Sequence, residues 1–331
     1  DPAGDAFWER RLRYAWDYRK TVMGEADSRC CRIIFGEADG FPGLTVDRFE
    51  RVLVAQVLSL GMERIKERVL PLLVRILRED GQVIRGVYER NDAPLRTLEG
   101  MAQGKGWLVL PGEAAPEGTA EDITENGIRY TVDFENGQKT GFFLDQKYNR
   151  LAVAKLAKGK TVLDCFTHTG SFALNAARGG AARVTAVDVS EFAVECAREN
   201  AARNGLSQVV DCVAANVFDL LPQLQKGQYD FIILDPPAFT KSRQTTQRAM
   251  AGYKEINYRA MKLLPRGGYL ATCSCSHFAS EALFIKMLRD AARDAGVQLR
   301  QIEARQQSAD HPILWGVEET SYLKFYLFQV V

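Results

Sequence analysis

The chain has 331 residues, of which 46% are hydrophobic and 26% are charged, and its formal net charge is +1. This length favours about two domains of roughly 100–200 residues each, and the near-neutral balance excludes a uniformly basic coat for nucleic acid while leaving room for a local basic groove. No apolar run is long enough to span a bilayer, and the first residues lack the apolar stretch of a secretory signal.

The first part of the chain is expected to form a polar helix followed by a small α+β domain. Residues 1–28 are rich in arginine and aromatic side chains and predict the helix. Residues 29–137 alternate strand-like runs with turn signals, and the Asn126–Gly127 pair predicts a hairpin turn. The expected strands are 32–35, 44–49, 51–58, 86–90, 106–112 and 122–134, and apolar residues at helical spacing predict a helix at 62–80.

The rest of the chain, residues 138–331, shows a different pattern from about residue 160 onward. Apolar, β-rich runs alternate with helical stretches, which indicates an α/β fold with a doubly wound, Rossmann-like parallel sheet. The strands are expected at 160–166, 183–190, 209–217, 229–237 and 267–275, with 297–307 and 321–331 as a closing antiparallel pair.

Two carboxylates and a glycine lie where the first two strands of this sheet should end. Asp164 and Gly170 bracket a tight loop that opens a helix, and Asp188 ends the next strand. Phe166 and Thr167 lie in the loop and join the candidate cofactor contacts. Ligands bind beyond such strand ends, and the single glycine lacks the G-x-G-x-x-G pattern that a pyrophosphate needs, so the residues favour S-adenosylmethionine (SAM) over a dinucleotide. The alternative is that the aspartates only cap helices.

The fourth strand should end at Asp235, directly before Pro236 and a second proline. Prolines cannot continue a strand ladder, and the carboxylate with nearby carbonyl oxygens could receive the amine and ring nitrogen of a base. Phe239 is available to stack on a base, and Lys241 could meet phosphate. The alternative is a capping aspartate at an ordinary strand–loop junction.

Cys273 and Cys275 alternate with serines at the expected end of the fifth strand. Either they pack there as small apolar residues, or one of them is a nucleophile. A thiol and the Asp235 carboxylate at neighbouring strand tips suit methylation of carbon 5 of a pyrimidine, in which a thiolate first adds to carbon 6. Because ligands lie beyond the strand ends, we expect Cys275 to be the nucleophile and Cys273 to lie one step deeper. His277 and Lys241 are candidates for a cation that favours the thiolate.

Five segments carry motifs whose order and spacing form a set. They are KTGFFLDQKYNR, VLDCFTHTGSFALNAARGGAARVTAVDVS, DPPAFTKS, CSCS and SADHPILWGVEETSYLKFYLFQV. As a set they resemble the SAM-dependent 23S ribosomal RNA cytosine carbon-5 methyltransferases, over most of the chain. The resemblance implies a class I methyltransferase domain at 138–331, preceded by a small central domain at 29–137. It also implies an N-terminal RNA-binding PUA domain; we expect the chain to lack it and to begin at the linking helix, residues 1–28.

The resemblance implies further site residues. Three of them are expected to fold over the cofactor: Lys139, Phe143 and Gln146. Cys275 matches the family's nucleophile, at the second cysteine of CSCS. Asn216 stands where an aspartate often receives the adenine amine, and His168 stands where an aromatic residue is expected.

The expected activity is the formation of 5-methylcytosine in ribosomal RNA, with SAM as cofactor, ribosomal RNA as partner and no metal. One alternative is amine methylation of adenine or guanine, which needs no cysteine and has an aromatic residue where Ala238 stands here. Another is an RNA-binding assembly factor without turnover. The seven cysteines fit neither a disulfide framework nor a zinc site, so we expect a cytoplasmic protein without membrane association, and the sequence leaves a homodimer open.

Overall fold

The computed structural model describes residues 4–239 and 243–331, which form two compact units. The first unit comprises Asp1–Asp145 and Ser308–Thr320, and the second comprises Gln146–Gln307 and Ser321–Val331. The first unit therefore extends a few residues past 137, where the sequence predicts the small domain to end. None of the helices in the described part of the chain is long and apolar enough to cross a membrane.

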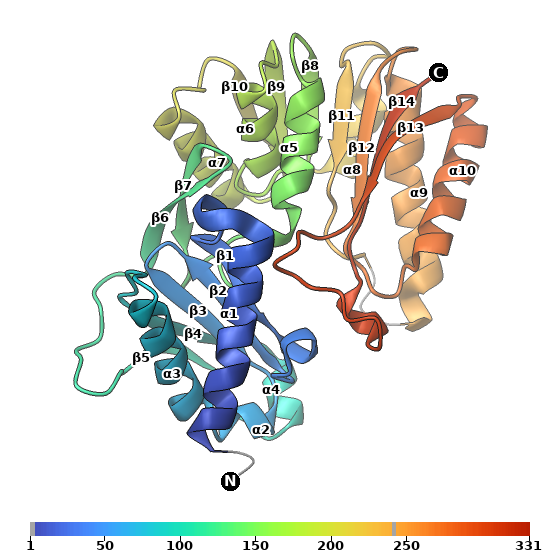
Figure 1. The fold of residues 1–331 in the computed structure, drawn as a ribbon. Coiled ribbons are helices and arrows are strands. Elements are labelled where there is room, and N and C mark those ends of the chain that lie inside the picture. The colour runs from blue at the N-terminus through green and yellow to red at the C-terminus, as the bar shows by residue number, and fades with distance from the viewer. Residues whose placement is uncertain (1–3, 240–242) are drawn as a thin grey trace. The chain divides into compact units, whose positions relative to one another are not determined.

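The first unit contains a five-stranded mixed sheet in the order β1-β2-β3-β4-β5 (Figure 1). β3 and β4 run parallel, and the other neighbours run antiparallel. β6 and β7 form a hairpin that turns at Asn126–Gly127, both with positive φ, as the sequence predicts. The α-helices, strands and 3-10 helices (η) are α1 (Asp5–Asp27), β1 (Cys30–Phe35), η1 (Gly36–Asp39), β2 (Leu44–Phe49), β3 (Val52–Val57), α2 (Leu60–Glu63), α3 (Lys66–Glu79), β4 (Gly86–Asn91), α4 (Leu95–Leu98), β5 (Gly104–Leu108), β6 (Ala120–Glu125), β7 (Ile128–Asp133) and η5 (Glu318–Thr320).

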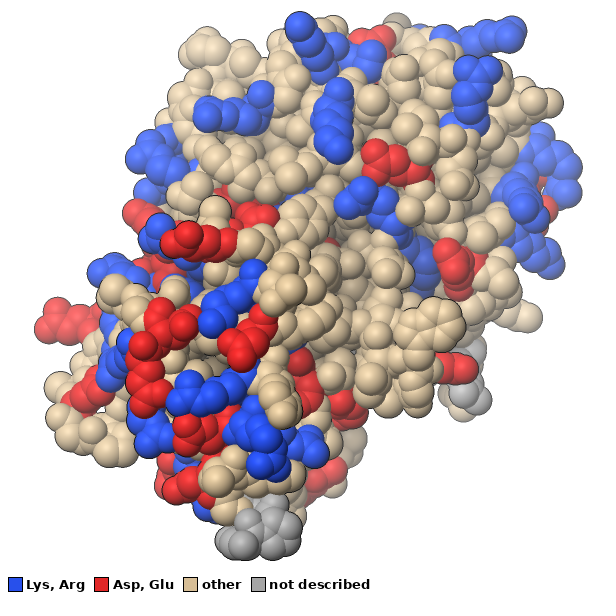
Figure 2. All heavy atoms as spheres, in the orientation of Figure 1, with Lys and Arg blue, Asp and Glu red and all other residues tan. Residues whose placement is uncertain are grey.

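The polar faces of α1 and α3 are joined by ion pairs. Arg13 binds Glu9 and Glu79 at 2.7 Å each, and Arg75 binds Glu9 at 2.9 Å. Figure 2 shows basic and acidic side chains intermixed over the visible surface of this unit. Arg13 of the N-terminal helix is therefore paired with acidic side chains. This pairing is typical of a solvated helix face and not of a basic surface that binds nucleic acid.

Residues 308–320 belong to the first unit although they follow β13 of the second in the chain. The Asp310 carboxylate accepts a hydrogen bond from the Arg32 backbone N–H at 2.8 Å, and the Asp310 carbonyl accepts one from the Arg19 guanidinium at 2.9 Å. Arg19 is fully buried and also binds Asp39 at 2.5 Å. The returning segment thus supplies polar partners for buried groups of the first unit.

The second unit contains a seven-stranded sheet in the order β10-β9-β8-β11-β12-β14-β13, with the first five strands parallel (Figure 1). β14 runs antiparallel to both β12 and β13, so the predicted doubly wound sheet and its closing antiparallel pair are confirmed. The elements are η2 (Leu144–Gln146), which straddles the unit boundary, α5 (Lys147–Leu156), β8 (Thr161–Cys165), α6 (Ser171–Arg178), β9 (Arg183–Asp188), α7 (Glu191–Arg203), β10 (Val210–Ala214), α8 (Val217–Leu220), η3 (Leu221–Gln223), β11 (Phe231–Leu234), η4 (Arg243–Thr245), α9 (Thr246–Leu263), β12 (Tyr269–Ser274), α10 (Glu281–Ala295), β13 (Leu299–Arg305) and β14 (Lys324–Val330).

The central strands of this sheet are buried on both faces, which is why their sequences are almost wholly apolar. All four residues of β11 are buried, as are four of the five in β8. Leu234 at the end of β11 lies opposite Cys165 of β8 and Thr272 of β12. The loops that follow these three strands therefore emerge at one edge of the sheet, where the candidate residues lie.

Candidate active site at the strand ends

The loop between β8 and α6 is held in an unusual backbone conformation. Phe166 and His168 have positive φ angles of 63° and 52°, and Gly170 has a φ of 85°. Positive φ costs energy for residues with a side chain, and such residues gather at functional sites. A Cβ atom at Gly170 would lie 3.1 Å from the Cβ of Ala197, so this position needs glycine for both conformation and space.

Asp164, at the end of β8, is fully buried beneath this loop. Its Oδ2 atom accepts hydrogen bonds from the Thr167 hydroxyl at 2.6 Å and the Ala173 N–H at 2.9 Å. Its Oδ1 atom has no hydrogen-bond partner among the described residues. Burial raises the pKa of Asp164 to about 7, and the Asp235 and Asp188 carboxylates add to this, although the hydrogen bonds from Thr167 and Ala173 oppose it.

This orphaned oxygen fits the amino group of SAM. A buried carboxylate oxygen without a donor costs free energy that an ammonium group can recover by a charge-assisted hydrogen bond. Asp164 would hold the methionyl ammonium, and the strained loop lies directly beside it. The same observation weighs against an aspartate that serves only as a helix cap, because a cap would leave its free oxygen in water.

Asp188 is oriented by two backbone donors. Its Oδ2 atom accepts from the His168 N–H at 2.9 Å and its Oδ1 atom accepts from the Ser190 N–H at 3.0 Å. The carboxylate is half-buried, so its remaining lone pairs can receive the hydroxyl groups of a ribose. Burial lowers the pKa of His168 to about 4, with Arg150 in the same sense and Asp188 opposing, and the imidazole is therefore neutral at pH 7.

Asn216 follows β10 and caps α8. Its side-chain oxygen accepts from the Phe218 N–H at 2.9 Å, and the residue is exposed. The carbonyl oxygen has a second lone pair, so the predicted role toward an adenine amine stays open to it.

On the other side of β8, Asp235 follows β11 and lies beside Cys273 of β12. Gln146 donates a hydrogen bond from Nε2 to Oδ1 of Asp235 at 3.1 Å, and Asn149 in turn donates to Gln146 Oε1 at 2.6 Å. Burial and the Asp235 carboxylate raise the pKa of the Cys273 thiol well above its ordinary value, against the effect of Gln146. Cys273 is completely buried and remains a thiol.

Cys275 lies one residue beyond the end of β12 and is partly exposed. The sequence argument from strand register does not extend to it, because the ladder stops at Ser274. Lys324, a residue that sequence reasoning missed, lies opposite Ser274 at the start of β14 and is 9% exposed. Burial lowers the pKa of Lys324 to about 8, and the nearby Cys275 opposes this by favouring the ammonium form.

Two of the three predicted substrate residues, Pro236 and Phe239, lie in the loop that follows β11. Pro236 is buried, and the Phe239 ring packs against Tyr253, Phe218 and Phe166 with centroids 4.7, 5.8 and 6.3 Å away. Phe239 is half-buried, so part of it faces outward. Lys241 lies outside the described residues.

The remaining candidates, Lys139 and Phe143, belong to the first unit. The Lys139 ammonium lies 4.9 Å from the centre of the Phe143 ring, and Lys139 has a positive φ of 51°. Thr140 between them donates to the buried Asp47 at 2.6 Å, which anchors the segment. Their part over the cofactor stays a prediction.

The sequence alone did not single out three further residues of the second unit, Lys147, Arg150 and Thr169. Lys147 and Arg150 are buried cations on α5, and the Arg150 guanidinium lies 5.8 Å from the centre of the Phe172 ring on α6. The hydroxyl of Thr169 in the strained loop has no hydrogen-bond partner among the described residues.

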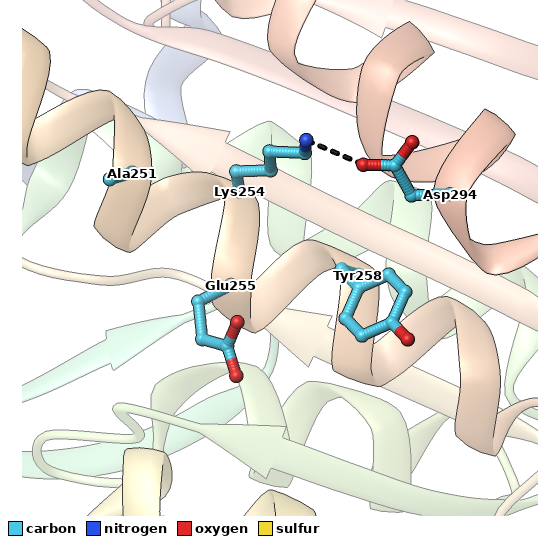
Figure 3. Close-up of a pocket in the computed structure, with 5 residues that line it drawn as sticks. All are labelled: Ala251, Lys254, Glu255, Tyr258 and Asp294. Carbon is cyan, nitrogen blue, oxygen red and sulfur yellow. Dashed lines mark ion pairs between the residues drawn. The ribbon is translucent and has the colours of Figure 1, made fainter.

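Two hollows lie away from the strand ends. Ala251, Lys254, Glu255, Tyr258 and Asp294 line one on helices α9 and α10, where Lys254 and Asp294 form an ion pair at 2.6 Å (Figure 3). The other lies beside α7 and β10 and includes Cys212. Neither contains a candidate site residue. Within 4–239 and 243–331, no group of three or more histidine, cysteine, aspartate or glutamate residues could hold a metal ion.

Comparison with known proteins agrees with this geometry. Residues 107–329 match the family described as S-adenosylmethionine-dependent methyltransferase. The ribosomal RNA large subunit methyltransferase I of Pseudoalteromonas translucida is 42% identical over 321 residues, which cover 96% of this chain and 79% of that protein. The corresponding protein of Klebsiella pneumoniae strain 342 is 39% identical over 329 residues, covering 98% and 80%.

The fold recurs in a solved structure at lower identity. This structure is of a putative methyltransferase complexed with SAH, and it superposes on this chain with a TM-score of 0.82. The two chains are 23% identical, and the match covers 98% of this chain and 81% of the other. This likeness confirms the fold class, and the family match confirms SAM as the cofactor. The strained loop, the orphaned buried carboxylate and these matches lead to one assignment: the chain belongs to the SAM-dependent methyltransferases, in the family of the ribosomal RNA large subunit methyltransferases I.

Proposed function

We propose that this chain methylates carbon 5 of a cytosine in 23S ribosomal RNA through a transient adduct with Cys275. The names of its relatives support ribosomal RNA as the substrate. The observation that supports the cysteine chemistry best is the arrangement around β11. The buried Asp164 and its strained loop lie on the β8 side, and two thiols and the Asp235 carboxylate lie on the β12 side.

On the cofactor side, Asp164 would bind the methionyl ammonium and Asp188 would bind the ribose hydroxyl pair. Gly170 lets the loop approach closely, with Phe166 and Thr167 beside it. Bound SAM supplies the electrophilic methyl group that carbon 5 takes up. Lys139, Phe143 and Gln146 are expected to cover it, and Asn216 to receive the adenine amine.

On the substrate side, the Cys275 thiolate forms a bond from sulfur to carbon 6 of the cytosine. The π electrons of the bond between carbons 5 and 6 move toward carbon 5, which becomes nucleophilic. Once carbon 5 is methylated, a general base removes the proton from carbon 5. The double bond between carbons 5 and 6 then re-forms, and the bond from sulfur to carbon 6 breaks. The thiolate is then regenerated, so the cysteine is not consumed.

Asp235 would hold a proton at the ring nitrogen, and this proton neutralises the negative charge that the thiolate brings to the ring during addition. Gln146 holds this carboxylate in place by the hydrogen bond at 3.1 Å. Cys273, buried and protonated, supports the strand end and does not attack. Pro236 and Phe239 would border the base, and Lys241 is proposed to meet a phosphate.

The test uses RNA that contains 5-fluorocytosine, which has no carbon 5 proton to lose and therefore stalls the adduct. With SAM present, the wild-type chain and Cys273→Ala should both give a covalent RNA complex on a denaturing gel, and Cys275→Ala should give none. Trapping that is lost only in Cys273→Ala would move the nucleophile to Cys273. Methylation that survives both substitutions would refute the adduct and favour amine methylation.

A further inference from the structure

Lys324 lies at the edge of the sheet where the Cys275 loop begins. β12 and β14 pair antiparallel, and Ser274, the last residue of β12, is paired with Lys324, the first residue of β14. Only 9% of Lys324 is exposed, although lysine is almost never buried without a partner. Strand pairing with Ser274 therefore fixes the backbone of Lys324, and burial restricts its side chain.

The side chain of Lys324 reaches the segment that contains the proposed nucleophile. Its Nζ atom donates a hydrogen bond to the carbonyl oxygen of Ser276 at 2.7 Å. Ser276 is 2% exposed and directly follows Cys275. The ammonium group is thus tied to the backbone next to the thiol in a site with little water, where a positive charge acts strongly on its neighbours.

We infer that Lys324 is a positioning residue that stabilises the thiolate form of Cys275 and fixes the loop on which it lies. The inference rests on the proposed function, since it assigns Lys324 a part in the same cysteine chemistry. A cation beside a cysteine lowers the pKa of the thiol, and the thiolate is the nucleophilic form. From the sequence alone, His277 and Lys241 are the candidates for this cation. His277 is exposed, with its ring 5.4 Å from that of Tyr322, and Lys241 lies outside the described residues.

The charges around Lys324 favour this role. Burial lowers its pKa to about 8, while Cys275 and Glu281 favour the ammonium form. At pH 7 the amine is therefore mostly charged. Glu281 is also held by the Tyr326 hydroxyl at 2.7 Å.

Tyr253 and Cys273, two other titratable groups near the Cys275 loop, do not supply a positive charge. Burial raises the pKa of Tyr253 to about 12, and Cys275 and Asp235 act in the same direction, so Tyr253 is neutral. Burial raises the pKa of the Cys273 thiol, the Asp235 carboxylate acts in the same direction, and Cys273 therefore stays protonated. Lys324, whose ammonium bonds to the backbone of this loop, can thus offset the charge of a thiolate there.

The proton and charge balance is simple. The Cys275 thiol loses its proton to solvent, and the resulting thiolate faces the Lys324 ammonium. When sulfur bonds to carbon 6 of the base, its negative charge passes to the base, and the charge returns when that bond breaks. Lys324 stays protonated throughout and transfers no proton.

The experiment measures the reactivity of Cys275 in the full chain without RNA or SAM. Iodoacetamide alkylation is followed by mass spectrometry of the Cys275 peptide between pH 6 and 10. Lys324→Met should raise the apparent pKa of Cys275 by at least one unit, which makes alkylation at pH 7 about tenfold slower. Lys324→Arg should restore most of the rate. Lys254→Met, which removes the exposed ion pair with Asp294, is the matched control and should keep the wild-type profile.

A reciprocal measurement covers the case in which Lys324→Met fails to fold. Cys275→Ser should make the Lys324 amine more reactive toward reductive methylation at pH 8, because it removes the anion that favours the ammonium form. Wild-type alkylation in a folded Lys324→Met, or unchanged Lys324 reactivity in Cys275→Ser, would overturn the inference. Failure of 5-fluorocytosine trapping with Lys324-dependent alkylation intact would instead refute the proposed function alone.

Discussion

Asp235 and Cys273 lie at the same level of two neighbouring parallel strands, one residue beyond the aligned pair Leu234 and Thr272. Burial and the Asp235 carboxylate together raise the pKa of the Cys273 thiol well above its ordinary value, so it stays protonated. Because Cys273 is buried and protonated, we propose Cys275, the next thiol along the chain, as the reactive one, with Asp235 acting on the substrate.

Asp235→Asn should slow methylation by about 10²–10⁴-fold, the usual contribution of a positioned acid or base. SAM affinity should change little, because Asp235 is assigned to the base and not to the cofactor. Single-turnover methylation of ribosomal RNA and calorimetry with SAM measure the two effects. Asp230→Asn is the control: Asp230 lies just before β11, at its other end, and accepts from the Thr161 N–H at 2.9 Å. Equal rates in the two variants would remove Asp235 from the chemistry.

Asp188→Ala should weaken SAM binding by on the order of 1–3 kcal/mol, which is roughly 5- to 150-fold in Kd. The loss comes from hydrogen bonds between the carboxylate and the ribose. Titration calorimetry without RNA measures it. Asp211→Ala removes an exposed carboxylate from the neighbouring strand β10 and should leave the affinity unchanged. An unaltered Kd in Asp188→Ala would take Asp188 out of the site.

SAM binding near pH 7 should release protons from Asp164. The free protein holds this carboxyl with a pKa of about 7, and an ammonium beside it lowers that pKa again. At pH 7 about half a proton should therefore leave on binding, and affinity should fall as the pH drops below 7. Calorimetry in buffers of different ionisation enthalpy counts the protons. The same proton count in Asp164→Asn would show that another group is responsible.

Asp164→Asn should also stabilise the ligand-free protein at neutral pH. The pKa of this carboxyl is raised on folding from 3.8 to about 7, so the folded state binds more protons and its stability falls as pH rises between these values. Above pH 7 the variant should gain on the order of 1–3 kcal/mol in the free energy of unfolding, and near pH 4 almost nothing. Urea unfolding at pH 4, 5.5 and 7.5 tests the trend. A gain that is constant with pH would contradict a buried charge as its cause.

Gly170→Ala should destabilise the protein by about 1–3 kcal/mol and weaken SAM binding as well. The new methyl group meets both a positive φ and the Cβ of Ala197 at 3.1 Å. Gly205→Ala is the control, since Gly205 has a φ of 67° but no atom within 4 Å of the added Cβ. It should cost only about 1 kcal/mol, the strain of the backbone, and leave SAM binding intact. Equal effects of the two substitutions on SAM binding would argue against a close approach at Gly170.

The sheet of the second unit was predictable because burial on both faces requires continuous apolar sequence. Runs such as FIIL in β11 can be recognised without any knowledge of their partners. Asp164, Asp188 and Asp235 were found for a related reason: a carboxylate directly after such a run lies at a strand end. The sequence could also predict the turn at Asn126–Gly127, because its chemistry is local.

Lys324 could not be found in this way. It is separated from Cys275 by 48 residues in the chain, and only the antiparallel insertion of β14 beside β12 brings the two together. The same pairing explains why the strand-register argument could not separate Cys273 from Cys275. What distinguishes the thiols is where the ladder stops and which charges face them, and both depend on strands distant in sequence.

The placement of residues 308–320 in the first unit has a consequence for the order of events during synthesis. These residues are made after almost all of the second unit, yet they supply the Asp310 partners of Arg19 and Arg32. Domains of many proteins fold one after another as they leave the ribosome. Here the N-terminal unit must wait for residues 308–320 before its buried Arg19 gains all of its acceptors. A nascent chain stalled before residue 308 would thus hold an unfinished first unit, however long it is given to fold.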